Sequence, residues 1–154
     1  MRALVWIVED TWEATVAAAA AFLPGEADVT LLHVAASDVE GIAGGARHGL
    51  LGRRPPPPGP HAPLRAISEQ AARDLLADAR ARLGRDAATD ARRGRVEHEV
   101  VDAARDMDLL VLARDGERDR PGPRSIGHAT RFVLDHAPCD VLLVWGAEGY
   151  NQAS

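Results

Sequence analysis

Four short, largely apolar runs constrain the fold of this chain more than any other feature of its sequence. Each is four to six residues long, too short for a buried helix and typical of a strand covered on both faces. Segments with helical periodicity separate them, so strands and helices alternate. This alternation predicts an α/β protein whose parallel sheet is covered on both faces by right-handed crossovers. The runs are Ala3–Val8, expected at the centre of the sheet, Val29–Val34, Leu109–Leu112 and Val141–Trp145.

The helices expected between these strands are amphipathic. In the first helix, Trp12, Val16 and Ala20 fall on one face. Gly84 closes the longest helix. A weak and polar fifth strand, Ala87–Arg93, is expected only at an edge of the sheet. The expected helices are Trp12–Phe22, Leu64–Leu83, Val96–Arg105 and Ile126–His136.

The length and the pattern indicate one domain over residues 1–146. A chain of 154 residues is long enough to bury a real core. Residues 36–63 interrupt the alternation with glycines and then prolines, and we expect this insert to be flexible rather than to have a defined role. The polar tail, 147–154, is expected to fray.

The composition excludes several functional classes. All eighteen basic residues are arginines, which excludes a catalytic lysine, a P-loop and a lysine-dependent phospho-accepting receiver domain. The net charge of −5 argues against a nucleic-acid partner. Cys139 is the only cysteine, and no histidine spacing indicates a metal site. The chain shows no signal peptide and no apolar run of membrane-spanning length, so we expect a cytoplasmic protein without a membrane partner.

One stretch combines a strand, a glycine-bearing loop and a helix start, which is how α/β proteins build an anion cradle from backbone N–H groups. The strand is Leu109–Leu112, the loop contains Gly116, and the helix starts near Ser125 or Ile126. Four arginines, Arg114 first among them, could clamp phosphates as forked donors. Three acidic residues alternate with them and leave one net positive charge, so a solvated, salt-bridged loop is the favoured interpretation.

Several motifs taken together resemble the universal stress protein family. The resemblance covers nearly the whole chain outside residues 36–63. It lies in the last helix and strand, the second and fourth strands, and the entry to the third helix. The matching segments are Gly127–Cys139 with Asp140 and Val141–Val144, Thr30–Val34, Asp108–Gly116, and Gly94–Val100.

This resemblance implies a doubly wound, five-stranded parallel sheet in the order 3-2-1-4-5, with helices on both faces. It also implies a role in stress response and a homodimer paired through the last strand, Val141–Trp145. Trp145 is then either a dimer contact or part of the core.

The ATP-binding branch of this family carries Gly-x2-Gly-x9-Gly-Ser/Thr, and the chain departs from that motif at three points. Ala113 replaces the first glycine, and its Cβ hinders the close approach of a phosphate. Ten residues, 117–126, separate Gly116 from Gly127, and two prolines among them donate no N–H. His128 replaces the hydroxyl-bearing residue. The resemblance therefore implies a degenerate nucleotide-binding loop.

If the loop keeps its function, the resemblance implies an adenine-nucleotide site with ATP and Mg²⁺ as the cofactor. Adenine would lie near Val34 and Ala35, and the ribose near Glu9 or Asp10. An equally open interpretation makes those acids, with Thr11, the N-cap residues of the first helix. The phosphates would lie over the loop and the helix start, at Arg114, Gly116, Gly127, His128 and Ala129.

We therefore expect a cytosolic dimer that acts in stress response through protein contacts. The alternative is an ATP- or adenine-nucleotide-binding regulatory module that uses residues 113–128. No pattern indicates a catalytic triad or a metal-activated water, so slow ATP hydrolysis ranks last. His33 is interpreted as a satisfied partner within the sheet, and Cys139 as a small buried hydrophobe.

Overall fold

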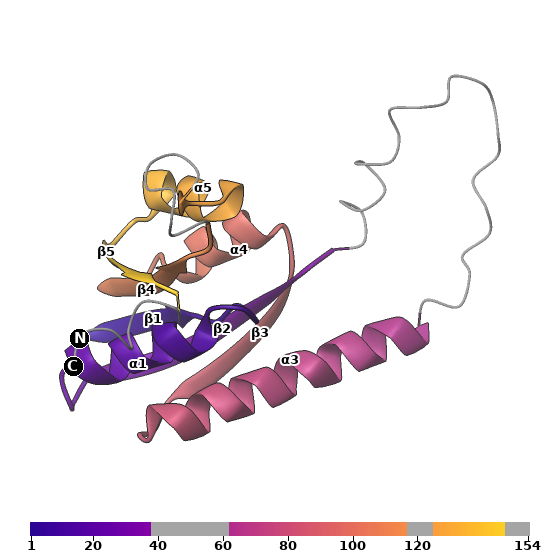
Figure 1. Ribbon diagram of the computed structural model, residues 1–154, viewed down its shortest axis with the longest axis horizontal. Coiled ribbons are helices and arrows are strands. Elements are labelled where there is room, and N and C mark those ends of the chain that lie inside the picture. The colour runs from indigo at the N-terminus through magenta and orange to yellow at the C-terminus, as the bar shows by residue number, and fades with distance from the viewer. Residues whose placement is uncertain (38–61, 117–124, 147–154) are drawn as a thin grey trace.

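A computed structural model describes residues 1–37, 62–116 and 125–146 of the chain. Its five parallel strands form one sheet in the order β3-β2-β1-β4-β5 (Figure 1). This confirms the predicted α/β fold and the central place of the first strand. The elements are β1 (Arg2–Trp6), α1 (Trp12–Phe22), β2 (Asp28–Ala36), α3 (Ala62–Leu83), β3 (Ala88–Gly94), α4 (Val96–Ala103), β4 (Leu109–Arg114), α5 (His128–His136) and β5 (Asp140–Trp145).

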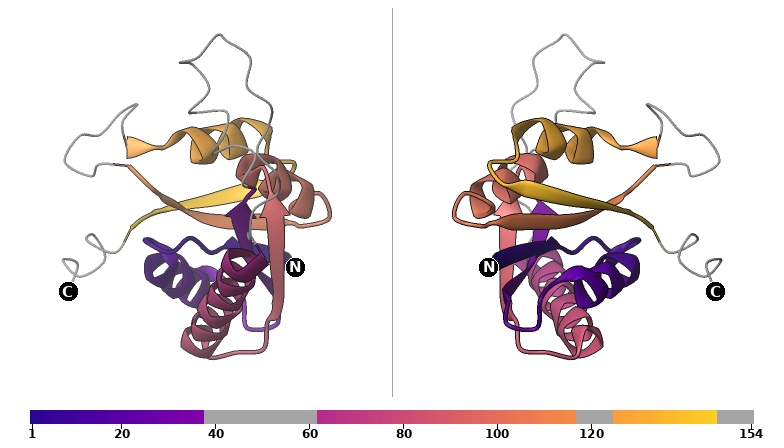
Figure 2. Two further views of the ribbon diagram at one scale, coloured as in Figure 1. Left: turned by 90° about the vertical axis from the view of Figure 1, so that its right-hand side faces the viewer. Right: turned by 90° about the vertical axis from the view of Figure 1, so that its left-hand side faces the viewer.

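Two pairs of helices cover the two faces of the sheet (Figure 2). α1 and α3 pack together on one face, and α4 and α5 pack together on the other. Consecutive side chains of β1 therefore enter opposite cores. Ala3 and Val5 join the core under α1 and α3, whereas Leu4 and Trp6 join the core under α4 and α5. A strand buried on both faces needs an unbroken apolar run, which is the pattern of this sequence.

β1 ends at Trp6, two residues before the predicted boundary at Val8, and the Val8 carbonyl already serves the start of α1. The Ile7 N–H still donates to the Leu32 carbonyl, at 2.8 Å. The Val8 carbonyl accepts from the N–H groups of Thr11, at 3.1 Å, and Trp12, at 2.8 Å. Thr11 occupies the N-cap position of α1, but its side chain makes no capping hydrogen bond.

All four helices differ in detail from the prediction. α3 begins two residues earlier than predicted, at Ala62, and α4 ends two residues earlier, at Ala103. α1 has the predicted bounds, but Ala20 is exposed, while Thr15, Val16 and Ala19 are buried. A run of alanines is apolar on all sides, so its sequence does not identify the buried face. α5 begins at His128, two residues later than predicted, because Gly127 is its extended N-cap with φ −69° and ψ 172°.

β2 and α3 extend into the two ends of the predicted insert, residues 36–63. Ala36 belongs to β2, and α3 begins at Ala62 and ends before Gly84, which adopts a φ of 70°. Residues 38–61 of the expected flexible insert, and the tail 147–154, lie outside the described residues. β3 lies at a sheet edge, as its polar sequence predicts. Within the described ranges, no helix combines the length and the apolar character needed to cross a membrane.

Candidate functional site

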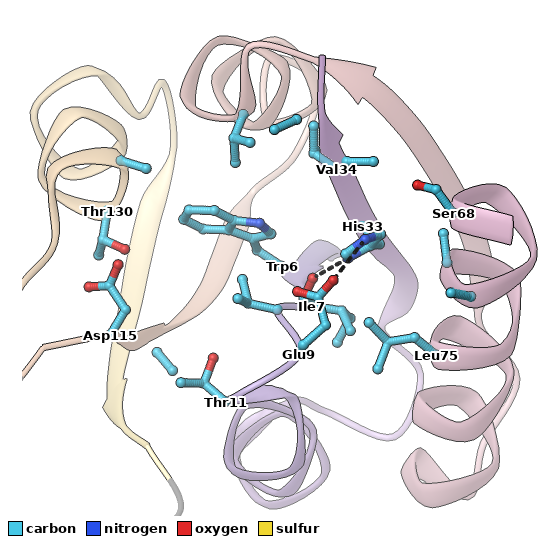
Figure 3. A pocket seen from close by; sticks show the side chains of 18 residues that line it. Trp6, Ile7, Glu9, Thr11, His33, Val34, Ser68, Leu75, Asp115 and Thr130 are labelled. Carbon is cyan, nitrogen blue, oxygen red and sulfur yellow. Dashed lines mark hydrogen bonds and ion pairs between the residues drawn. The ribbon is translucent and has the colours of Figure 1, made fainter. Parts of the chain in front are cut away.

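A pocket of about 540 Å³ lies at the carboxyl edge of the sheet, where β1, β2 and β4 end (Figure 3). Ligands of open α/β sheets bind at this edge, where the strand order reverses. One wall comes from β2, α3 and the start of α4, and it is largely apolar. Its residues are Val34, Ala35, Ala71, Ala72, Leu75 and Val96.

His33 holds the ends of β1 and β2 together beneath this wall. Its ring is buried, and Nδ1 lies 2.9 Å from the Ile7 carbonyl oxygen. A carbonyl oxygen only accepts, so Nδ1 is the donor in this contact. Nε2 lies 3.6 Å from a carboxylate oxygen of Glu9, whose side chain is 69% exposed at the pocket rim. The predicted role of His33, a satisfied partner within the sheet, agrees with the Ile7 contact, although His33 also lines the pocket.

Trp6 lines the pocket between its two walls. Its indole belongs to the core under α4 and α5, and only 5% of the residue is exposed. Figure 3 shows the ring between Val34 on one side and Asp115 with Thr130 on the other. The indole therefore lines the pocket but exposes little of its surface to a ligand.

Asp115 lines the opposite wall of the pocket, where its side chain contacts the N-terminus of α5. It directly follows β4, and its Oδ1 accepts a hydrogen bond from the Gly127 N–H at 2.6 Å. A Cβ at Gly127 would collide with the same carboxylate, so the close approach depends on glycine at this position. The negative charge lies at the helix N-terminus, where the helix dipole favours it.

Arg114 faces a different part of the molecule. Its Nη1 donates to the Ser125 hydroxyl at 2.8 Å. Its guanidinium carbon lies 4.5 Å from the centre of the Trp145 ring, at the end of β5. Such a cation–π contact ties the ends of β4 and β5 together.

The structure brings together four of the residues proposed from the sequence. Glu9, Val34, Ala35 and Ala129 line the pocket. The other five are not among its lining residues: Asp10, Arg114, Gly116, Gly127 and His128. Gly127 nevertheless lies at its edge through the bond to Asp115, whereas Asp10 and His128 are exposed.

Several lining residues were not selected from the sequence. Trp6 looked like an ordinary strand residue, and Ser68 lies on a helix whose pairing with the sheet no local pattern reveals. Asp115 could have been found from the sequence, because it is the first acidic residue after a buried strand. Further examples are Thr11, Ala71, Leu75 and Thr130.

The chemistry of the lining favours a largely uncharged ligand. Among the described residues, the pocket is lined by two carboxylates, Glu9 and Asp115, and by no arginine. Thr11, Ser68 and Thr130 add hydroxyl groups. No cluster of three or more His, Cys, Asp or Glu side chains that could hold a metal ion occurs in the described part of the chain. A flat heterocycle with polar edges fits this lining.

Comparison with known proteins identifies a family. The model of the universal stress protein family matches residues 4–144. No curated protein matches the sequence.

Solved structures of similar fold cover the chain almost completely. Hypothetical protein MJ0577 has a TM-score of 0.70 and 18% identity, over 95% of this chain and 96% of that one. A universal stress protein in complex with cAMP has a TM-score of 0.57 and 20% identity, over 96% and 98%. A universal stress protein family protein from Arabidopsis thaliana with AMP bound has a TM-score of 0.55 and 13% identity, over 100% and 97%. At these identities the likeness shows the fold.

Proposed function

Since this chain belongs to the universal stress protein family, we propose that it is a stress-response regulatory protein that binds an adenine-bearing ligand. The observation that carries this proposal is the pocket of about 540 Å³ at the carboxyl edge of the sheet, which has a largely apolar wall. Two proteins of the same fold are described as complexes with cAMP and with AMP, and both ligands contain adenine.

In this proposal the adenine lies against Val34 and Ala35, and the ribose lies near Glu9. Val34 and Ala35 belong to the apolar wall, which suits the faces of a purine. The Glu9 carboxylate can accept hydrogen bonds from ribose hydroxyls at the rim. Asp10 is exposed and is not among the lining residues, so Glu9 is the preferred partner of the two.

Adenosine titration by calorimetry tests the proposal. Binding should be saturable with one site per chain. A parallel readout is the fluorescence of a W12F/W145F variant, in which Trp6 is the remaining tryptophan. Adenosine should change the emission of Trp6, because the indole lines the pocket. Absence of heat and of any fluorescence change at millimolar adenosine would refute the proposed function.

A second part of the proposal is that the protein acts as a dimer through β5 and signals by protein contacts. β5 is an edge strand whose apolar residues, Val141 to Trp145, are all half-buried. A row of half-exposed apolar side chains on an open sheet edge is characteristic of an interface.

Val144→Arg tests this interface. Val144 is half-buried but belongs to neither core cluster of the described residues, so the change leaves the packing beneath the sheet intact. Sedimentation should give a dimer for the wild type and a monomer for Val144→Arg. A monomeric wild type, or a variant that stays dimeric, would refute pairing through β5.

A further inference from the structure

The α5 end of the pocket carries a negative charge of its own. Strand, loop and helix N-terminus form the arrangement that receives anions in α/β proteins. Here Asp115 takes that place, with Oδ1 2.6 Å from the Gly127 N–H. The side chain reaches α5 from the end of β4, twelve residues earlier in the chain.

The geometry leaves no room for a second anion against Gly127. The carboxylate approaches so closely that a Cβ on Gly127 would overlap it. A phosphate at this position would have to displace the carboxylate or lie beside it, and like charges at such distances repel each other.

The charges on the described residues that line the pocket do not offset this repulsion. Glu9 adds a second carboxylate to the lining, and no arginine among the described residues lines the pocket. Arg114 is bonded to the Ser125 hydroxyl and stacked on Trp145. The part of the pocket that the structure describes therefore has the wrong charge for a phosphate.

We infer that the pocket selects an uncharged adenine nucleoside over its phosphorylated forms, because the Asp115 carboxylate occupies the anion position of α5. This inference rests on the proposed binding of an adenine-bearing ligand. It assigns Asp115 as a specificity-determining residue: the apolar wall selects the heterocycle, and the carboxylate rejects the phosphate.

Asp115→Asn separates charge from shape. The asparagine side-chain oxygen can still accept the hydrogen bond from Gly127, so the local structure is kept while the negative charge is removed. Asp106→Asn is the matched control. It makes the same change in net charge at an exposed residue before β4, at the opposite edge of the sheet from Asp115.

The experiment is calorimetric titration of the wild type and both variants with adenosine, AMP and ATP, each with and without Mg²⁺. The wild type should bind adenosine at least roughly tenfold more tightly than AMP, and ATP more weakly still. Asp115→Asn should reduce the preference for adenosine by roughly tenfold or more, chiefly by tightening AMP and ATP. Asp106→Asn should behave like the wild type. Should Asp115→Asn not fold, the wild-type preference still decides the question.

Three outcomes would overturn the inference. One is a wild type that binds ATP as tightly as adenosine, and another is an Asp115→Asn protein with an unchanged preference. The third is ATP binding that requires Mg²⁺ and is lost in Asp115→Asn, since Asp115 would then be a metal ligand. If neither the wild type nor Asp115→Asn binds any of the three ligands, the proposed function itself fails.

Discussion

The two ends of the pocket are held by hydrogen bonds of different kinds. At the β1–β2 end, the buried His33 ring contacts the Ile7 carbonyl at 2.9 Å. At the α5 end, the exposed Asp115 carboxylate accepts from the Gly127 N–H at 2.6 Å. Breaking the first bond strands a polar group away from water, whereas water can replace the second. The β1–β2 end therefore fixes the shape of the pocket, and the α5 end sets its charge.

The largest effect should come from filling the apolar end. Ala71 is exposed on α3 and lines the pocket, so Ala71→Phe places a ring where the ligand would lie without disturbing the core. Adenosine affinity should fall by roughly a hundredfold or more, about 2.7 kcal/mol. Ala77→Phe is the control, because Ala77 is exposed on the same helix and is not among the residues lining this pocket. Unchanged adenosine binding by Ala71→Phe would place the ligand elsewhere.

Removing the buried bond should cost stability. His33→Ala leaves the Ile7 carbonyl without its partner, and we expect the free energy of unfolding to fall by about 2 kcal/mol. Urea denaturation measures this change. His136→Ala serves as the comparison, because the ring of His136 contacts the Phe132 carbonyl at 2.8 Å in an exposed setting. Equal losses for the two variants would contradict the distinction between the ends.

Gly127→Ala should have a smaller effect at the α5 end. The new Cβ would overlap the Asp115 carboxylate and force it off the helix N-terminus. Loss of such a cap costs about 1 kcal/mol, and the preference for adenosine should shrink with it. Gly25→Ala is the control, because no atom lies within 4 Å of a Cβ built there. A Gly127→Ala protein with full stability and unchanged selectivity would show that the carboxylate is not held as described.

The smallest effect concerns the stability of the fold at acidic pH. It involves Glu97, which is not among the residues lining the pocket. Burial alone would raise the pKa of Glu97, but hydrogen bonds from its own backbone N–H and from Arg95 outweigh it and hold the pKa below the ordinary 4.5. A lowered pKa stabilises the fold above 4.5, and this contribution is lost as the pH falls through the folded-state value.

Glu97→Gln should therefore lose less stability on acidification than the wild type, by about 0.5–1 kcal/mol. Thermal melts between neutral and acidic pH measure this difference. Glu26→Gln, at an exposed turn residue, should follow the wild-type curve. A Glu97→Gln protein as acid-sensitive as the wild type would assign the effect to other carboxyl groups.

Much of the fold was predictable because its signals are local. A strand buried on both faces needs a largely apolar run. β1, β4 and β5 have a continuous one, and β2 has one interrupted by Thr30 and His33. β3 was identified as an edge strand from its polar sequence and lies at that edge. The outward position of Ala20 was not predictable, since alanines on every side of α1 give the helix no apolar stripe.

The site was less predictable because it depends on contacts between distant segments. The family resemblance pointed to Glu9, Val34, Ala35 and Ala129, and these four line the pocket. Asp115 appeared as one acid within a loop of alternating charges. Its contact with Gly127, twelve residues away, depends on how the end of β4 meets α5, which no local pattern encodes.

The most direct test of the account follows the backbone amides of wild-type protein by NMR during separate titrations with adenosine and AMP. Adenosine should shift the amides of Val34 and Ala35 and leave that of Gly127 bonded to Asp115. AMP should produce the same shifts only at higher concentration, again without moving Gly127. A Gly127 amide that shifts with AMP as early as Val34 and Ala35 do would show that the phosphate takes the place of the carboxylate, which contradicts the account.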